Sequence, residues 1–477
     1  MSLLRTLAGN LASMSAMRLG SALISFAVFW YLARSSDASL VGAYAFLLGV
    51  YAFLQQLPLL GLHLVAVRDV AADADAAPRI AANLGALGFA TAALMGVTCY
   101  GTGLLLYPPD THTAFALLGL AMLPTAWINV AEAVLIGRQN MSTVAAVNLV
   151  ESVLRALFSA VAVWQNLGLD ALFLIFCLGR LGSALAYSRS AGVPAWQVRL
   201  LDWRALRRHL AECPVFFGIM LLSAAVSRFD LFFLSRLGGF AELGVYAVAA
   251  KIYEAALMAP SVISSVLYPA FSQLAAQDAR QMEVVLRTAL AWVFILALPC
   301  ALLVGLLAES LISLAFGPTY VAAAPVLQLL MVALVLVALN QILTLALLSR
   351  HEQRADLYSL LASTLSMALL LAILIPLHGM LGAAQAVVLT MLVQLAIRYA
   401  FVRSRLQLRP RLGALWRPLV AGAAMLSAGL LPMPLAVTLP LALGTYVAVL
   451  YATGGIGTDA VRAAMDLLRT RRGVRAP

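Results

Sequence analysis

The sequence predicts an all-α polytopic membrane protein with about 14 transmembrane helices, built as two six-helix lobes related by an internal repeat plus two C-terminal helices. Composition, a series of apolar segments and the repeat itself support this prediction. Of the 477 residues, 63% are hydrophobic and only 11% are charged, and the mean hydropathy is +0.97. A soluble protein has about a quarter of its residues charged. This much apolar surface requires lipid as the surrounding solvent.

A stretch near residue 40 recurs 202 residues later in the chain without a gap. Leu-Ala-Arg is followed ten residues later by a tyrosine in the first copy, and Leu-Ser-Arg is followed in the same way in the second. The matched pairs are Arg34 and Arg236, Tyr44 and Tyr246, Tyr51 and Tyr253, and Pro58 and Pro260. This self-similarity indicates that one half of the protein was duplicated.

Fourteen apolar segments are long enough to be candidate spans, since a helix needs about 20 apolar residues to cross the hydrocarbon core. The first six lie near residues 13–33, 40–64, 82–106, 113–137, 142–164 and 168–188. The next six lie near residues 214–235, 242–268, 287–308, 324–349, 356–376 and 380–402. Two shorter segments follow near residues 416–432 and 435–453.

The arginines between the spans predict the orientation of the chain, because short cytoplasmic loops collect basic residues. The odd-numbered loops hold only Arg34 and Arg236, which we expect to fix the outer helix ends symmetrically. The even-numbered loops and the tail hold Arg68, Arg79, Arg138, the arginines of 189–208, Arg280, Arg287, Arg350, Arg354 and those of 403–417 and 462–475. Both termini are therefore predicted to be cytoplasmic. The net charge of +11 is explained by this topology, so no nucleic-acid partner is expected.

Five parts are expected along the chain. They are an N-terminal lobe over 1–195, an interfacial linker helix over 196–213, a C-terminal lobe over 214–405, two additional helices within 406–455 and a basic cytoplasmic tail over 456–477. The linker intersperses tryptophan and leucine with arginine, which suits a helix lying on the inner leaflet, and a solvated charged linker is the alternative. Six spans separate the repeat copies, so both lobes cross in the same direction. Transporters built in this way place their substrate between the halves near the midplane.

Charged residues inside the spans are the candidate functional residues, because each costs at least about 2.5 kcal/mol on membrane-insertion scales. The cations are Arg18, Arg155, Arg180, Arg228 and Lys251, and the acids are Glu132, Glu151, Asp230 and Glu254. The excess of cations predicts a cavity that binds an anionic substrate, with the acids as charge partners or ion-coupling groups. Pairing along one helix is the alternative for Glu151 with Arg155 and for Lys251 with Glu254.

Two prolines and four cysteines complete the set of unusual residues. Pro58 and Pro260 predict paired kinks that help to open and close the cavity, although proline is also ordinary in membrane helices. The cysteines form no spaced pairs, so neither a disulfide framework nor a metal site is predicted. They are Cys99, Cys177, Cys213 and Cys300. Nucleotide-binding, zinc-protease and dithiol motifs are absent from the sequence, so we expect no enzyme activity and no cofactor.

Several of these segments resemble those of Wzx-type polysaccharide (oligosaccharide) flippases, which belong to the multidrug/oligosaccharidyl-lipid/polysaccharide exporter superfamily. The matching segments are Leu-Ala-Arg34, Val-Gly-Ala-Tyr44, Leu60-Gly61, Val67-Arg68-Asp69-Val70-Ala71, Asp230 before Phe-Phe-Leu-Ser-Arg236, Gly244-Val-Tyr246, Pro260, Tyr268-Pro269-Ala-Phe-Ser272 and Phe316-Gly317-Pro318-x-Tyr320. The resemblance covers about residues 10–400, and these are loose motifs of a broad superfamily.

The resemblance implies a two-lobed transporter that works by alternating access. Its substrate would be an oligosaccharide on undecaprenyl pyrophosphate, flipped from the cytoplasmic to the periplasmic leaflet of the inner membrane during synthesis of lipopolysaccharide O-antigen or exopolysaccharide. Membrane lipids and the polymerase and assembly proteins of polysaccharide synthesis would be its partners. The cations inside the spans would meet the pyrophosphate and acidic sugars. Fourteen spans are similar to the lipid II flippase branch, in which the last two helices offer a groove for the lipid tail.

Two other functions remain open at this point. A cation-coupled multidrug exporter of the same superfamily would use a cavity acid, for which Glu254, Asp230 or Glu132 is available. A non-transporting component of a polysaccharide assembly complex is the second alternative. The arginine excess favours the flippase over the exporter.

Reporter fusions test the fourteen-span topology. Fusions after residues 110, 167 and 378 should report the periplasm, and fusions after 75, 205 and 410 the cytoplasm, because these positions fall in alternate loops. Alkaline phosphatase activity and fluorescent-protein signal at each position check the prediction. Reversed signals at any two positions contradict it.

Overall fold

The computed structural model describes residues 20–57, 59, 62–73, 75–193, 200–202, 207, 214–261, 263–264, 267, 271, 279–408, 412–431 and 434–455. These residues are mostly helical and include no strand. After helical residues 20–35 come α2 (Ala38–Leu54), α3 (His63–Ala72), α4 (Ala77–Leu106), α5 (His112–Gly137), α6 (Met141–Trp164) and α7 (Gly168–Ala191). The second half holds α9 (Pro214–Val226), α10 (Phe229–Leu237), α11 (Gly239–Ala256), α13 (Ala279–Leu306), α14 (Ala308–Phe316), α15 (Ala324–Ser349), α16 (Gln353–Arg405), α17 (Trp416–Gly429) and α18 (Leu435–Ala452).

The predicted all-α polytopic membrane class is confirmed. Among the described residues, seven helices are long and apolar enough to cross a membrane, or eight if α9 and α10 count as one bent span. Within the described residues, each of the fourteen predicted spans includes helical residues. The 53-residue α16 contains two of them, separated at Gly379, whose φ of +58° interrupts the helix. Glycine adopts this left-handed conformation without steric cost.

Two predicted spans are shorter as helices than the sequence indicated. The second gives α2, which ends at Leu54 before α3 begins at His63, and the eighth gives α11, which ends at Ala256 before further helical residues at 258–261. Each helix ends four residues before a repeated proline, Pro58 or Pro260. A proline nitrogen carries no hydrogen, so it cannot bond the carbonyl four residues earlier. The repeat in the sequence therefore reappears as two helices that end at equivalent positions.

The seventh predicted span is also interrupted. It divides into α9 and α10, which meet at a 44° bend around Ser227 and Arg228. The interfacial linker helix predicted over 196–213 and the tail over 456–477 lie outside the described residues, apart from 200–202 and 207.

The helices form two compact units, which are described separately. The first comprises Met1–Val248 with Met367–Ala383, and the second comprises Ala249–Ser366 with Ala384–Pro477. Helices α11 and α16 contribute residues to both units. The lobes predicted over 1–195 and 214–405 were inferred from the sequence repeat, and they stay a prediction.

Helices α2 and α11 touch through repeat-related glycines in the first unit. A Cβ on Gly42 would collide with the carbonyl oxygen of Phe240, and a Cβ on Gly244 would collide with that of Ala38. Both pairs of equivalent residues, Gly42 with Gly244 and Ala38 with Phe240, are 202 residues apart. Such reciprocity is the mark of contact across a two-fold axis. Only glycine allows the two backbones to approach this closely.

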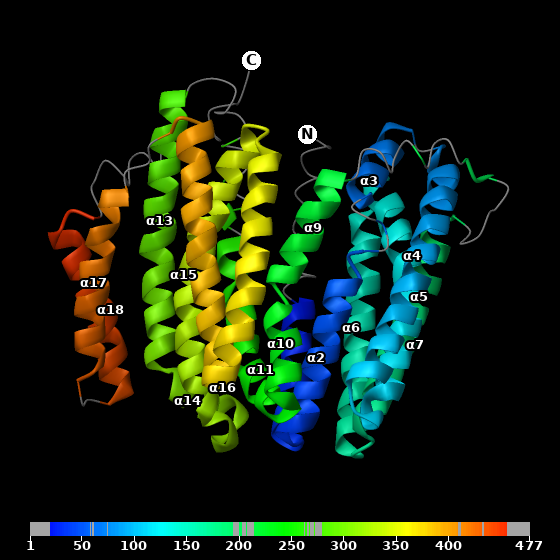
Figure 1. The fold of residues 1–477 in the computed structure, drawn as a ribbon, viewed down its shortest axis with the longest axis horizontal. Helices are drawn as coiled ribbons and strands as arrows, with labels where there is room; N and C mark the ends of the chain where they lie inside the picture. The colour runs from blue at the N-terminus through cyan, green and yellow to red at the C-terminus, as the bar shows by residue number, and fades with distance from the viewer. Residues whose placement is uncertain are drawn as a thin grey trace. The chain divides into compact units, whose positions relative to one another are not determined.

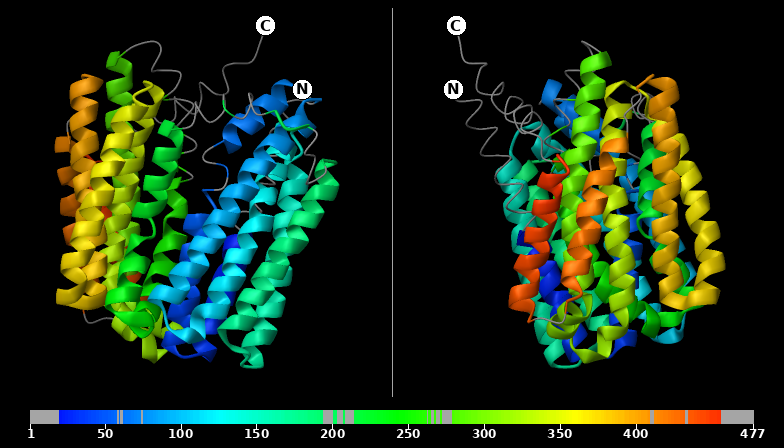
Figure 2. Two further views of the ribbon diagram at one scale, coloured as in Figure 1. Left: turned by 45° about the vertical axis from the view of Figure 1, so that its right-hand side comes forward. Right: turned by 90° about the vertical axis from the view of Figure 1, so that its left-hand side faces the viewer.

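The rest of the first unit is a bundle in which α4, α5, α6 and α7 lie side by side (Figures 1 and 2). Trp127 of α5 and Tyr187 of α7 are buried in one apolar cluster with Leu62, Leu84 and Ile128. Helix α5 is the most enclosed of these four helices, since 67% of the residues in its most apolar stretch are buried. Polar side chains of α7 contact this central helix, since Arg180 donates to Thr125 and Ser188 accepts from Trp127.

In the second unit, α17 and α18 pack against α13 (Figure 1). Gly422 of α17 lies against Leu298 and Leu302 of α13. Pro299 interrupts the hydrogen bonding of α13, since it has no N–H for the Ile295 carbonyl. The buried hydroxyl of Tyr446 in α18 donates to that carbonyl at 2.9 Å. The last helix is thus bonded to the backbone group that the proline leaves open.

Replacing Tyr446 should loosen this junction. Tyr446→Phe leaves a buried carbonyl without a donor, and we expect a loss of about 1–3 kcal/mol in the free energy of unfolding in detergent. In a Pro299→Ala background, the new N–H can bond Ile295, so the effect of Tyr446→Phe should fall by at least half. Tyr451→Phe is the control, because that side chain is 75% exposed. Equal losses in both backgrounds would contradict the proposed pairing.

Candidate functional site

Two of the predicted cations lie on one pair of aromatic rings in the first unit. The guanidinium carbon of Arg155 (α6) is 5.4 Å from the centre of the Phe176 ring, and that of Arg180 (α7) is 5.8 Å from the centre of the Tyr51 ring. The two rings meet edge to face with centroids 4.6 Å apart. A cation over an aromatic face gains about 0.5–2 kcal/mol, more as water is removed. We call these four side chains the arginine–aromatic cluster.

The two arginines of this cluster differ in their partners. Arg155 Nε lies 3.4 Å from Glu151 Oε1 on the same helix, so the predicted local pairing is present. Arg180 Nε donates to Thr125 Oγ1 at 3.4 Å, and Tyr51 Oη lies 3.0 Å from the same hydroxyl. Within the described residues, no carboxylate lies within ion-pair distance of Arg180. In the described part of the chain, the Arg180 side chain is therefore accompanied by a hydroxyl and an aromatic ring and by no counter-charge within ion-pair distance.

The other predicted charges of the first unit occupy different places. Arg228 is half-buried at the bend before α10. Asp230 accepts a hydrogen bond of 2.7 Å from the buried Tyr246 hydroxyl, which engages this acid in the packing of α10 on α11. Glu132 is half-buried on α5. Arg18 lies outside the described residues.

Lys251 belongs to the second unit and is paired along its own helix. Its Nζ lies 3.3 Å from Glu254 Oε2, with three residues between the two positions on α11. This is the local pairing that the spacing allowed. Pro260 is buried, and Pro58 lies outside the described residues, so a gating role for the two prolines stays a prediction. A joint role of Arg180, Arg228 and Lys251 also stays a prediction.

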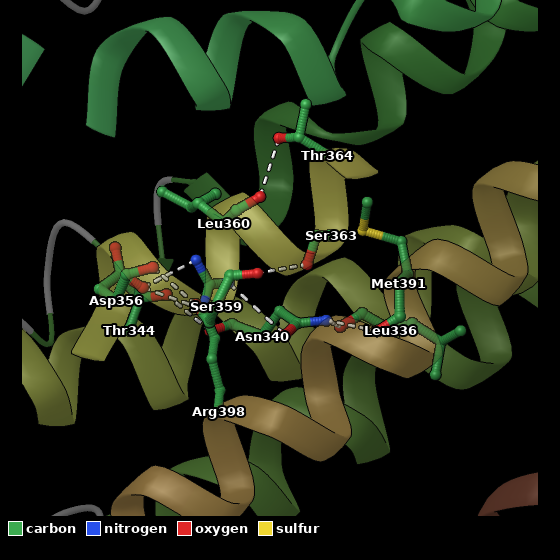
Figure 3. Close-up of polar contacts among 10 residues, drawn as sticks. All are labelled: Leu336, Asn340, Thr344, Asp356, Ser359, Leu360, Ser363, Thr364, Met391 and Arg398. Atoms are coloured by element: carbon green, nitrogen blue, oxygen red, sulfur yellow. Dashed lines mark hydrogen bonds and ion pairs between the residues drawn. The ribbon is translucent and has the colours of Figure 1, made fainter. Parts of the chain in front are cut away.

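A buried ion pair in the second unit was missed by the sequence analysis (Figure 3). Arg398 Nη2 lies 2.9 Å from Asp356 Oδ1, and the two side chains are only 7% and 4% exposed. Arg398 Nη1 also reaches Asn340 Oδ1 at 3.5 Å, and Asn340 Nδ2 donates to the carbonyl of Met391 at 3.0 Å. The network joins α15 to both parts of α16. Its charges are satisfied internally, which suits a structural role.

The signal for this pair lay in the turn between two spans. Asp356 precedes Gly379 by 23 residues and Arg398 follows it by 19, so a hairpin turn at Gly379 brings the two near the same end. Asp356 begins the predicted span 356–376, and Arg398 lies four residues before the end of the predicted span 380–402, so charges compared along single helices do not predict this pair. Opposite charges at similar distances from a turn are the pattern that predicts such a pair.

An aromatic cluster joins the two repeat copies at the predicted periplasmic end. Tyr107 follows α4, and the centroid of its ring lies within 6 Å of the ring centroids of Phe46, Phe115 and Phe240. Its hydroxyl lies 2.9 Å from Ser235 Oγ. Burial raises the pKa of Tyr107, while the Ser235 bond and the nearby Arg236 charge oppose this rise.

Arg236 is held at this end by the first copy. Its Nη1 donates to the carbonyl of Leu106 at 2.6 Å, in the last turn of α4, and its guanidinium lies 5.9 Å from the centre of the Tyr107 ring. The bond satisfies a carbonyl that the end of α4 leaves open. The geometry agrees with the expectation that Arg236 fixes an outer helix end. Its repeat partner Arg34 lies over the Trp30 ring at 5.7 Å.

Metal-ligand chemistry is not indicated by the described part of the chain. No group of three or more His, Cys, Asp or Glu side chains there is arranged to hold an ion.

Comparison with known proteins adds a family and a fold. Residues 31–325, more than half of the chain, match the family described as polysaccharide biosynthesis protein. No curated protein sequence matches the chain.

Solved structures resemble the fold closely. The lipid II flippase MurJ in an inward closed conformation aligns with a TM-score of 0.74 at 11% identity, over 92% of this chain and 98% of that one. An inward-facing multidrug resistance MATE family transporter of the MOP superfamily aligns at 0.65 and 15% identity, over 81% and 94%. A MOP superfamily transporter from Pyrococcus furiosus, described as having a binding pocket of reverse polarity, aligns at 0.55 and 15%, over 83% and 93%. At these identities the likeness concerns the fold.

Breaking the buried ion pair should be costly, whereas removing both charges should not. Asp356→Leu leaves Arg398 buried without a counter-charge, and we expect a loss of about 3–5 kcal/mol in the free energy of unfolding. The double variant Asp356→Leu, Arg398→Leu should recover most of that loss. Asp69→Asn, at the exposed Arg68–Asp69 pair, is the matched control and should change stability by less than about 1 kcal/mol. A double variant as unstable as the single would overturn this reading of the network.

Proposed function

Because the chain belongs to the polysaccharide biosynthesis protein family, we propose that it is a flippase for a lipid-linked oligosaccharide. The substrate would be an oligosaccharide on undecaprenyl pyrophosphate, moved from the cytoplasmic to the periplasmic leaflet of the inner membrane. The product would enter synthesis of O-antigen or exopolysaccharide, with the polymerase and assembly proteins as partners. A fold like that of a lipid II flippase supports a transporter rather than an enzyme.

The observation that carries the proposal is the environment of Arg180. Its guanidinium is half-buried within an apolar span and has no acidic partner among the described residues. A cation in this setting is costly unless it meets an anion, and such residues normally mark a substrate or ion path. The guanidinium fork binds phosphate oxygens in pairs, so the pyrophosphate of the substrate is a suitable ligand.

The contacts between the repeat copies support alternating access. The Gly42–Gly244 crossing and the cluster around Tyr107 hold the first and second copies together near the predicted periplasmic end. Release of cargo to the periplasm would require the Tyr107–Ser235 contact to separate. A closed outer end with cations further inside is the arrangement that a flippase needs while it loads substrate from the cytoplasm.

A cation-coupled drug exporter is supported less well by the same charges. Such a transporter needs an available acid, yet Asp230 accepts from Tyr246, Glu254 lies beside Lys251, and Glu132 also has a partner within the protein. The uncompensated charge of the cluster is positive. A non-transporting assembly component would have no need of an unpaired Arg180.

Substitution of Arg180 tests the flippase. Arg180→Ala removes a charge-assisted contact worth about 1.5–3 kcal/mol, so we expect the flipping rate to fall about 10- to 100-fold. Arg180→Lys should retain part of the rate, because lysine keeps the charge and loses the fork. The rate is measured in proteoliposomes that contain fluorescent undecaprenyl-pyrophosphate oligosaccharide. Arg189→Ala, at an exposed position in the last turn of α7, is the control. An unchanged rate for folded Arg180→Ala would reject the anion-binding role.

A further inference from the structure

Helices α6 and α7 enclose a groove that the cation hypothesis leaves unexplained. Its volume is about 550 Å³, within the range of ligand-binding pockets. Most of its wall is apolar, from Val150, Leu154 and Phe158 of α6 and Leu178 of α7. Gly182 leaves part of the wall open, since a Cβ there would meet no atom within 4 Å.

The groove opens toward lipid. The four apolar residues named above are between 48% and 58% exposed, on two helices that are long and apolar enough to cross the membrane. Large apolar side chains at such positions face hydrocarbon, so the groove is in contact with the tails of the bilayer. A helix is about 10–12 Å across with its side chains, which is too wide to enter a space of this volume between two neighbouring helices. A single hydrocarbon chain fits it better.

The inner wall of the groove is polar and is shared with the arginine–aromatic cluster. Glu151, Arg155 and Ser183 line it, and Arg155 is also the cation over Phe176. The Glu151–Arg155 pair is close to neutral, which suits a hydrocarbon neighbour. Ser183 Oγ is buried and has no hydrogen-bond partner among the described residues, and neither has Glu151 Oε1. Ser183 thus has a free hydroxyl for a polar group at the head of a chain.

We propose that this groove holds the polyprenyl chain of the lipid-linked substrate while its pyrophosphate binds Arg180. The inference rests on the proposed function, since it assumes a lipid-linked anion. A lipid-linked cargo must keep its tail in the membrane while its head group lies inside the protein. Arg155 connects the two environments, because it lines the groove and belongs to the cluster that contains Arg180. The last two helices are not needed for this tail site.

Photo-crosslinking of the full-length protein in nanodiscs tests the tail site. The probe is a polyprenyl diphosphate with a diazirine on its terminal isoprene unit, and labelled peptides are mapped by mass spectrometry. We expect label within 141–164 and 168–191. Gly182→Leu should fill the groove and lower this labelling about tenfold, and Gly182→Ala should lower it less. Gly444→Leu is the matched control, because its Cβ would also meet no atom and it lies on α18, outside the groove.

The outcomes separate this inference from the proposed function. Label on α17 and α18, or unchanged labelling in Gly182→Leu, would overturn the tail site, while loss of flipping in Arg180→Ala would still support the flippase. Label in the groove that Arg180→Ala does not weaken would support the tail site and count against the anion role. Disulfide-linked dimers through Gly182→Cys would show that a second copy covers this face, and would also overturn the tail site.

Discussion

In a membrane every backbone polar group must find its partner inside the protein, and this constraint governs how the chain is built. Helices α2 and α11 end at Leu54 and Ala256, whose carbonyls have no helical donor because Pro58 and Pro260 stand four residues later. At Pro299 the helix continues, and the Tyr446 hydroxyl supplies the missing donor to Ile295. At the end of α4, Arg236 supplies a donor to Leu106. Side chains from one helix thus donate hydrogen bonds to backbone carbonyls of another. The packing of these helices is therefore coupled to their backbone hydrogen bonding.

Charged side chains inside the spans also need partners. Those with a partner in the protein have a structural role, whereas one without a counter-charge is a candidate for function. Asp356 and Arg398 satisfy each other in a buried network, and Lys251 is paired with Glu254 along α11. In the buried Asp356–Arg398 pair, the attraction between the two charges offsets the free-energy cost of removing them from water. The partly exposed Lys251–Glu254 pair needs less compensation. Among the described residues, Arg180 has Thr125 and the Tyr51 ring beside it and no carboxylate within ion-pair distance. A residue left in this state points to a partner that comes from outside, which is why the proposed function depends on it rather than on the total count of cations.

The sequence predicts the fold class because hydropathy and the 202-residue repeat act along the chain, where spacing can be read directly. The pairing of Glu151 with Arg155 was accessible for the same reason, since both lie on one helix face. Contacts between helices were not accessible. The crossing of Gly42 with Gly244, the Asp356–Arg398 pair and the Tyr51–Phe176 rings depend on which helix faces meet. That choice is made by packing over the whole bundle, which spacing along one segment does not reveal.

The repeat shows how a symmetric frame carries an asymmetric function. Equivalent glycines cross, and equivalent helices end at the same place, so the frame of the two copies was conserved after duplication. Equivalent tyrosines are retained in both copies, but their contacts differ. The ring centroid of Tyr44 lies 5.9 Å from that of Phe173, whereas the hydroxyl of its partner Tyr246 donates to Asp230 at 2.7 Å. A two-fold frame suits paired motion of two halves. The proposed cargo has an anionic head and an apolar tail, and different contacts at equivalent positions of the two copies fit such a cargo.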